Sequence, residues 1–167
     1  AVIQMINHGI TSGALFMLVG FLYERRHTRR ISDFGGLKKS MPIYAGIFLF
    51  TSFASIGLPG LNGFVGEFMI LMGSFPTFNV LSSIAAFGVV LAAIYMLWAY
   101  QRMFNGELTH EDNKNLLDLN SKEIVSVAPL LILMLFIGLY PSFIESYVVQ
   151  DVSIIYESIN NTLGLSK

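Results

Sequence analysis

Glu67 is the one acidic residue inside the long apolar stretches of this chain, and it follows the helix-breaking run LPGLNG at Leu58–Gly63. A carboxylate surrounded by hydrocarbon is costly and is rare unless it has a function. An interrupted helix at membrane depth is also costly unless it lines a polar cavity. Together the two features predict a transport pathway for ions or protons. The predicted helix break consists of Leu58, Pro59, Gly60 and Gly63.

Glu67 is expected near the middle of the membrane, early in the second half of the broken helix. About eleven residues separate it from Phe78. That is roughly 16 Å of helix, about half of a hydrocarbon core of ~30 Å. Burial disfavours the charged carboxylate, whereas the positive end of the half-helix favours it. A carboxylate held between these effects can bind and release a proton near neutral pH, so we predict that Glu67 carries protons. The alternative is a static ion pair with a basic group elsewhere in the protein.

His8 is the second ionisable residue within an apolar stretch, and Gly9 and Gly13 around it let a neighbouring helix approach closely. An unperturbed histidine titrates at about pH 6.5, which suits a proton relay. The alternative is a histidine with one hydrogen bond to a backbone carbonyl and no titration. The nearby broken helix with Glu67 favours the relay.

Three hydroxyl residues precede the break, and their commonest role in a membrane helix is to bond a backbone carbonyl. A role in holding water is the second interpretation. These residues are Thr51, Ser52 and Ser55.

Composition indicates an all-α, polytopic integral membrane protein. Hydrophobic residues make up 54% of the 167 residues and charged residues only 13%, against about a quarter charged in soluble domains. The net charge of -1 gives no basic surface for a nucleic acid. There is no cysteine, and the three histidines lack metal-ligand spacing. We therefore expect no metal and no cofactor on this chain.

Four membrane-crossing segments can be delimited, within a transmembrane region of residues 1–142. The segments are residues 1–23, 42–75, 80–100 and 124–140. Asn120 and Glu123 have the spacing of a capping box at the start of the last one. Residues 143–167 carry apolar residues at helical spacing, which predicts an amphipathic helix on the membrane surface. The first residue lies in an apolar run without initiator Met or signal-peptide features, so we interpret the chain as a piece of a longer protein.

The segment at residues 42–75 determines the architecture. As one helix its 34 residues would measure about 51 Å, too long for a core of ~30 Å, whereas two full crossings would need about 40 residues. One crossing made of two half-helices fits best. Pro59 removes a backbone donor, and Gly60 and Gly63 permit unusual dihedral angles. A re-entrant hairpin and an ordinary kinked helix are the alternatives.

Loop charge predicts the orientation of the chain. The basic residues gather in the loops at 24–41 and 101–123, whereas the turn at 76–79 has none. The positive-inside rule therefore places both basic loops on the cytoplasmic side of a bacterial plasma membrane or the equivalent side of an organellar inner membrane.

The residues from Gln4 to Phe75 contain NHG, LFMLVG, YERRHTR, GGLKKSMP and ASIGLPGLNGFVGEFMIL. These motifs resemble the proton-pumping, antiporter-like membrane subunits of NADH–quinone oxidoreductase, respiratory complex I, in particular the carboxyl-terminal third of the subunit M branch. The resemblance implies two inverted-topology repeats, each with a broken helix. It also implies that Glu67 and His8 lie on a central hydrophilic axis. Related subunits and cation/proton antiporters usually carry Lys at the position of Glu67, so Glu favours the subunit M branch.

The function implied by the resemblance is proton translocation driven by electron transfer in other subunits. The expected partners are the other membrane and peripheral subunits, the lipid bilayer and protons. Alternatives are a subunit of a multisubunit monovalent cation/proton antiporter, of a membrane-bound hydrogenase or of a ferredoxin-fed complex. A structural scaffold in which Glu67 is permanently paired is a further alternative.

Overall fold

The computed structural model describes residues 2–163, and the regular elements within this range are all helices. The long ones are α1 (Val2–Arg26), α2 (Pro42–Ser55), α3 (Asn62–Ser74), α4 (Asn79–Phe104), α5 (Ser121–Leu139) and α6 (Pro141–Leu163). Three short 3-10 helices, Ile31–Asp33, Leu37–Lys39 and Glu111–Asn113, lie in the connecting loops. The predicted all-α class is confirmed.

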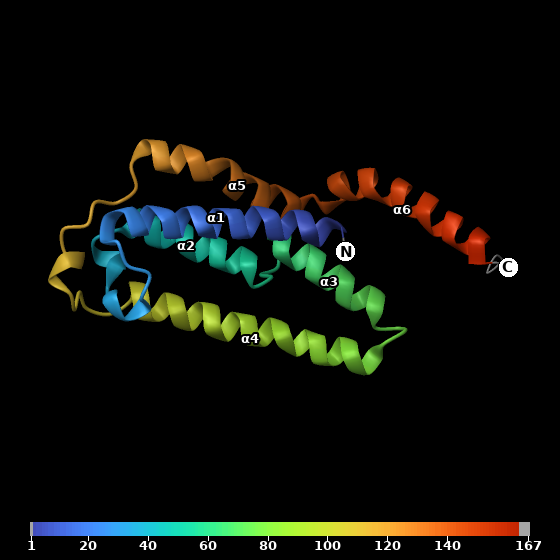
Figure 1. The fold of residues 1–167 in the computed structure, drawn as a ribbon, viewed down its shortest axis with the longest axis horizontal. Coiled ribbons are helices and arrows are strands. Elements are labelled where there is room, and N and C mark those ends of the chain that lie inside the picture. Colours follow the sequence, from blue (N-terminus) through green and yellow to red (C-terminus); the bar gives the residue numbers. More distant parts are fainter. Residues whose placement is uncertain (1, 164–167) are drawn as a thin grey trace.

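The helices α1, α2, α3 and α5 form a bundle, and α4 lies along one side of it (Figure 1). Helices α2 and α3 follow one another in the same general direction and together extend beside α1, which runs the opposite way. Helix α4 returns beside them, and α5 packs against α1 and α3. Helix α6 continues from α5 and leaves the bundle near the start of α1.

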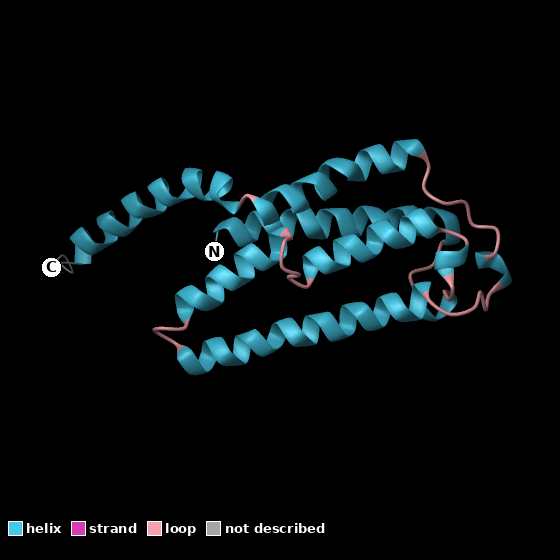
Figure 2. Cartoon of the chain, turned by 180° about the vertical axis from the view of Figure 1, so that it is seen from behind, coloured by secondary structure: helices cyan, strands magenta, loops and turns pink. Residues whose placement is uncertain are grey.

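Helices α1, α4 and α5 are each long and apolar enough to cross a membrane, and α2 is a shorter apolar helix. The predicted discontinuous helix is confirmed, because the helix ends at Ser55 and resumes at Asn62. The chain therefore has neither an ordinary kinked helix nor a re-entrant hairpin here, since α3 continues onward from α2 (Figure 2). Residues 141–163 form the predicted tail helix. Its place on the membrane surface stays a prediction, and residues 164–167 lie outside the described part.

Two apolar clusters hold the bundle together. At the end formed by the long loops, which we call the loop end (residues 27–41 and 105–120), aromatic rings stack between α2 and α4. Tyr44 lies 5.7 Å from Phe104, and Tyr100 lies 4.6 Å from Phe104, between ring centroids. The second cluster surrounds the helix break and uses smaller side chains. Its buried members are Ala14, Ala54, Leu61, Val127 and Met134.

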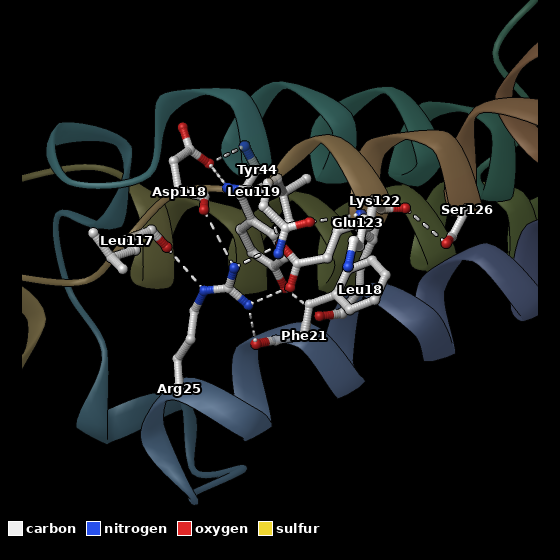
Figure 3. Close-up of polar contacts among 11 residues, drawn as sticks. Leu18, Phe21, Arg25, Tyr44, Leu117, Asp118, Leu119, Lys122, Glu123 and Ser126 are labelled. Carbon is white, nitrogen blue, oxygen red and sulfur yellow. Dashed lines mark hydrogen bonds and ion pairs between the residues drawn. The ribbon is translucent and has the colours of Figure 1, made fainter.

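A polar cluster centred on Arg25 ties the loop end together (Figure 3). The guanidinium makes two hydrogen bonds of 2.7 Å to the two carboxylate oxygens of Glu123. It also donates to the carbonyls of Phe21, Leu117 and Asp118 at 2.9, 2.8 and 3.2 Å. We call this arrangement the Arg25 anchor, and it fixes the end of α1 to the start of α5.

The same cluster caps two helices. The Asp118 carboxylate accepts the backbone N–H groups of Ile43 and Tyr44 at 2.7 and 3.0 Å, so a distant loop caps the amino end of α2. Asn120 and Glu123 form the predicted capping box at the start of α5. The loop end thus fixes where α2 and α5 begin.

Candidate functional site

Helix α2 ends in a glycine-dependent cap. Gly57 has φ +75°, the left-handed conformation that favours glycine. The N–H of Leu58 donates to the carbonyl of Phe53 at 3.0 Å, and the N–H of Gly57 donates to that of Ala54 at 3.4 Å. These are the two bonds of a Schellman motif, which satisfies carbonyls that the helix end would leave unpaired.

A tight turn then leads into α3. The N–H of Leu61 donates to the carbonyl of Leu58 at 3.1 Å, and Gly60 has φ +93°. Proline at the second position and a glycine with positive φ at the third are typical of a type II turn. Leu58, Pro59 and Gly60 therefore lie in the break as predicted, which spans residues 56–61.

Gly63 was predicted in the break but is the second residue of α3. Its role is close packing, because a Cβ at this position would collide with the carbonyl oxygen of Ala54. The glycine lets the first turn of α3 lie directly on the last turn of α2.

Glu67 lies in the second turn of α3 and its side chain reaches back to the break. A Cβ built on Gly57 would fall 2.5 Å from Glu67 Oε2, so the carboxylate rests on the backbone of this glycine. Within residues 2–163 the Glu67 carboxylate takes part in no hydrogen bond or ion pair, in contrast to Glu123. The lysines and arginines of the described part lie at helix ends and in loops, and His8 makes no ion pair with Glu67, so a static ion pair would need a basic group outside these residues.

The other side of Glu67 faces a groove of about 260 Å³ between α3 and α4. Gly88 on α4 has open space in front of it. Glu67 is the polar residue among the groove-lining side chains, which are otherwise Ile70, Leu71, Ala85, Gly88, Val89 and Ala92. The carboxylate thus sits at a boundary between the polar backbone of the break and an apolar groove.

Helix α1 presents Asn7 to the break. The Asn7 side-chain amide donates to the carbonyl of Asn62 at 2.7 Å, and the Asn62 amide donates to the carbonyl of Asn7 at 3.3 Å. His8 is exposed in this chain, and its carbonyl accepts the Ser12 hydroxyl at 2.5 Å. No hydrogen bond among the described residues joins His8 to Glu67. Its role as a relay stays a prediction.

Two of the three hydroxyl residues before the break bond backbone carbonyls of their own helix. Thr51 donates to the carbonyl of Ile47 at 2.9 Å and Ser52 to that of Phe48 at 2.7 Å, and both residues are fully buried. Ser55 is the last residue of α2 and is partly buried. A role of these three in holding water stays a prediction.

Three residues at the site were missed by the sequence analysis: Asn7, Asn62 and Gly138. A Cβ on Gly138 would fall 2.5 Å from the Cα of Leu61 and would collide with the carbonyl oxygen of Gly60, so α5 packs directly on the backbone of the break. The available signal was the presence of two asparagines in otherwise apolar runs, because buried amides in membrane helices bond across helices.

Known proteins resemble this chain over almost its whole length. Residues 1–80 match the sequence model of the family described as "NADH:quinone oxidoreductase/Mrp antiporter, TM". NADH-quinone oxidoreductase subunit M of Rhodobacter capsulatus is 43% identical over 164 residues, 98% of this chain and 32% of the relative. Subunit M of Rickettsia prowazekii is 45% identical over 144 residues, 86% of this chain and 29% of the relative. The chain belongs to this antiporter-like membrane subunit family.

The fold agrees with that membership. A chain in the structure of respiratory complex I from Thermus thermophilus with bound NADH superimposes with a TM-score of 0.77 and 34% identity. The match covers 85% of this chain and 30% of that chain. This antiporter-like chain therefore spans about a third of the length of the relatives that it matches.

Proposed function

We propose that this chain is part of a proton-translocating subunit M of an NADH–quinone oxidoreductase, and that Glu67 carries the translocated proton. The observation that supports the proposal is an acidic side chain with no partner in residues 2–163, resting on the backbone of an interrupted membrane helix. Electron transfer belongs to other subunits, and this chain needs no cofactor for its part. Its partners are the other subunits of the complex and the lipid bilayer.

The chemistry of the step is the binding and release of one proton at a Glu67 carboxylate oxygen. The apolar groove with α4 favours the neutral acid, whereas the amino end of α3 favours the carboxylate. Because the two influences oppose each other, a change of charge at a neighbouring site is enough to shift the balance. Electron transfer elsewhere in the complex would supply that change, and His8 would connect Glu67 to further sites.

The proposed orientation places the basic loops at 24–41 and 101–123 on the cytoplasmic side. A cation/proton antiporter subunit is the second candidate, because the matched family model covers Mrp antiporters as well. The subunit M relatives at 43% and 45% identity favour the oxidoreductase.

The proposal is tested by Glu67→Gln in the complete complex in sealed vesicles. Glutamine keeps the shape and hydrogen bonding of glutamate but cannot ionise, so NADH-driven acidification should be lost and quinone reduction depressed through coupling. Glu107→Gln in an exposed loop is the matched control and should behave as wild type. Glu67→Lys should retain more pumping than Glu67→Ala, because lysine is ionisable. Normal pumping by correctly assembled Glu67→Gln complex would remove Glu67 from the pathway.

A further inference from the structure

The contact between Asn7 and Asn62 is reciprocal and buried. Each side-chain amide donates to the backbone carbonyl of the other residue, at 2.7 and 3.3 Å. Asn7 is 1% and Asn62 0% exposed. The carbonyl of Asn7 also accepts the hydroxyl of Thr11 at 2.9 Å. We call this pair of bonds the asparagine clasp.

The clasp acts on the backbone where the broken helix resumes. Asn62 is the first residue of α3, and no side chain of its own segment caps that helix end. Because both acceptors are main-chain carbonyls, the clasp fixes the distance between the backbones of α1 and α3. Hydrogen bonds are electrostatically stronger in a medium of low dielectric constant, so this restraint is firm within a membrane.

A second contact lies one turn away, toward the start of α1 and further along α3. A Cβ on Gly66 would collide with Gln4 Oε1, so the side chain of Gln4 lies directly against the backbone of α3. Two contact points along one helix face fix its rotation as well as its position. Glu67 follows Gly66, about 100° further around the helix, and this rotation aims its carboxylate at Gly57 and the groove with α4.

Stability does not explain the choice of amides here. The side-chain oxygens of Gln4, Asn7 and Asn62 are buried without a hydrogen-bond donor in the described part of the chain. A buried polar atom without a partner is destabilising, whereas apolar side chains of the same shape carry no such cost. Within the described residues, positioning accounts for the two asparagines better than stability does.

We propose that Asn7 and Asn62 are positioning residues for proton transfer at Glu67. The clasp sets the rotation and depth of α3 and thereby holds the carboxylate against the break. Neither amide ionises, so neither carries the proton itself. This inference rests on the proposed function of Glu67.

The test replaces Asn7 in the complete complex, in sealed vesicles, with pumping expressed per assembled complex. Asn7→Leu keeps the branched shape of the side chain and removes the shorter of the two clasp bonds, the 2.7 Å bond to the Asn62 carbonyl, while the 3.3 Å bond from the Asn62 amide to the backbone of residue 7 remains possible. Assembly and melting temperature should stay near wild type. The pumping rate should fall roughly ten- to hundredfold, the effect expected when a reacting group is displaced by about 1 Å. The pH profile of pumping should also shift, because the surroundings of Glu67 change, and a purely structural role would not move it.

Asn7→Asp provides the conservative rescue. A neutral carboxylic acid can donate to the Asn62 carbonyl as the amide does, whereas the ionised form cannot. Pumping by this variant should therefore recover as the pH falls. The matched control is Ser74→Ala, which removes the 2.8 Å hydrogen bond between α3 and Ser82 of α4 far from the break. It should leave both the rate and the pH profile unchanged.

Wild-type pumping with an unchanged pH profile in Asn7→Leu would overturn the inference. If Asn7→Leu does not assemble, Asn7→Asp decides: recovery at low pH supports positioning, and an unaltered profile overturns it. Failure of both variants to assemble would also overturn it, because the fold itself would then require the clasp. Loss of pumping in Glu67→Gln together with normal Asn7 variants would leave the proposed function intact and reject only the clasp.

Discussion

Among the described residues, charged side chains are hydrogen-bonded at the Arg25 anchor, whereas polar side-chain oxygens lack donors at the helix break. At the anchor all three guanidinium nitrogens donate hydrogen bonds, and Glu123 accepts two of them. At the break the Glu67 carboxylate accepts none from the described residues, and the side-chain oxygens of Asn7 and Asn62 have no donor there. The two regions lie in one helical bundle and are joined by α1 and α2.

The difference follows from what each region has to do. A carboxylate that accepts a bidentate pair of charge-assisted hydrogen bonds is stabilised in its charged form and in one position. That suits a helix anchor and prevents proton exchange. Under the proposed function Glu67 must gain and lose a proton, so it cannot be tied in this way. Within residues 2–163 its carboxylate packs against Gly57 and pairs with no counter-ion. The anchor region should therefore control stability and the break should control pumping.

The largest loss of stability is expected for Arg25→Ala at the anchor. Its side chain and that of Glu123 are 15% and 12% exposed, so removal of the arginine leaves a mostly buried carboxylate unpaired. A fully buried pair would lose about 3–5 kcal/mol; with the remaining exposure we expect about 2–3 kcal/mol. The measurement is the melting temperature of the detergent-solubilised complex, beside the pumping rate per assembled complex at low temperature. Unchanged stability would mean that the anchor is not the stabilising region.

A smaller loss of stability, accompanied by a loss of pumping, is expected for Gly138→Ala. The added methyl group would collide with the backbone of the break, and such overpacking costs about 1–3 kcal/mol. Because the displaced segment lies beside Glu67, pumping per assembled complex should fall together with stability. Gly20→Ala on α1, where a Cβ meets nothing within 4 Å, is the control. Equal behaviour of the two variants would show that α5 does not support the break.

Asp118→Ala should cost about 1 kcal/mol, the usual effect of losing a helix cap. The two N–H groups that Asp118 accepts belong to the first turn of α2, far from Glu67. The melting temperature should therefore drop slightly while the pH profile of pumping stays unchanged. A shift of that profile would contradict the separation of the two regions.

The parts of this molecule that follow from neighbouring residues were predictable from sequence. The Pro59–Gly60 pair is typical of a type II turn, and the spacing of Asn120 and Glu123 determines a local cap. The position of Glu67 beside the break follows from the same local pattern. The cap that Asp118 gives to α2 joins residues 75 positions apart, which no local pattern reveals.

The residues that the sequence analysis missed or misplaced depend on contacts between distant segments. Asn7 and Asn62 are 55 positions apart, and their pairing depends on how α1 and α3 pack. Gly63 and Gly138 are needed for close backbone approaches, which composition alone does not distinguish from turns. Asn7 lies in an apolar helix, so the face of α1 that meets the break could be assigned only from the packed structure.

The smallest change in stability is expected for Glu67→Leu, which completes the comparison with Arg25→Ala. Leucine has nearly the volume of glutamate, and Glu67 has no partner among residues 2–163 that would be left unpaired. The apolar groove with α4 should accept the new side chain, so the free energy of unfolding should stay within about 0.5 kcal/mol of wild type or rise, and the melting temperature should follow it. Pumping should nevertheless be lost, because leucine binds no proton. A loss of stability as large as that of Arg25→Ala would instead indicate that Glu67 is tied to a basic group of another segment, as a structural scaffold requires.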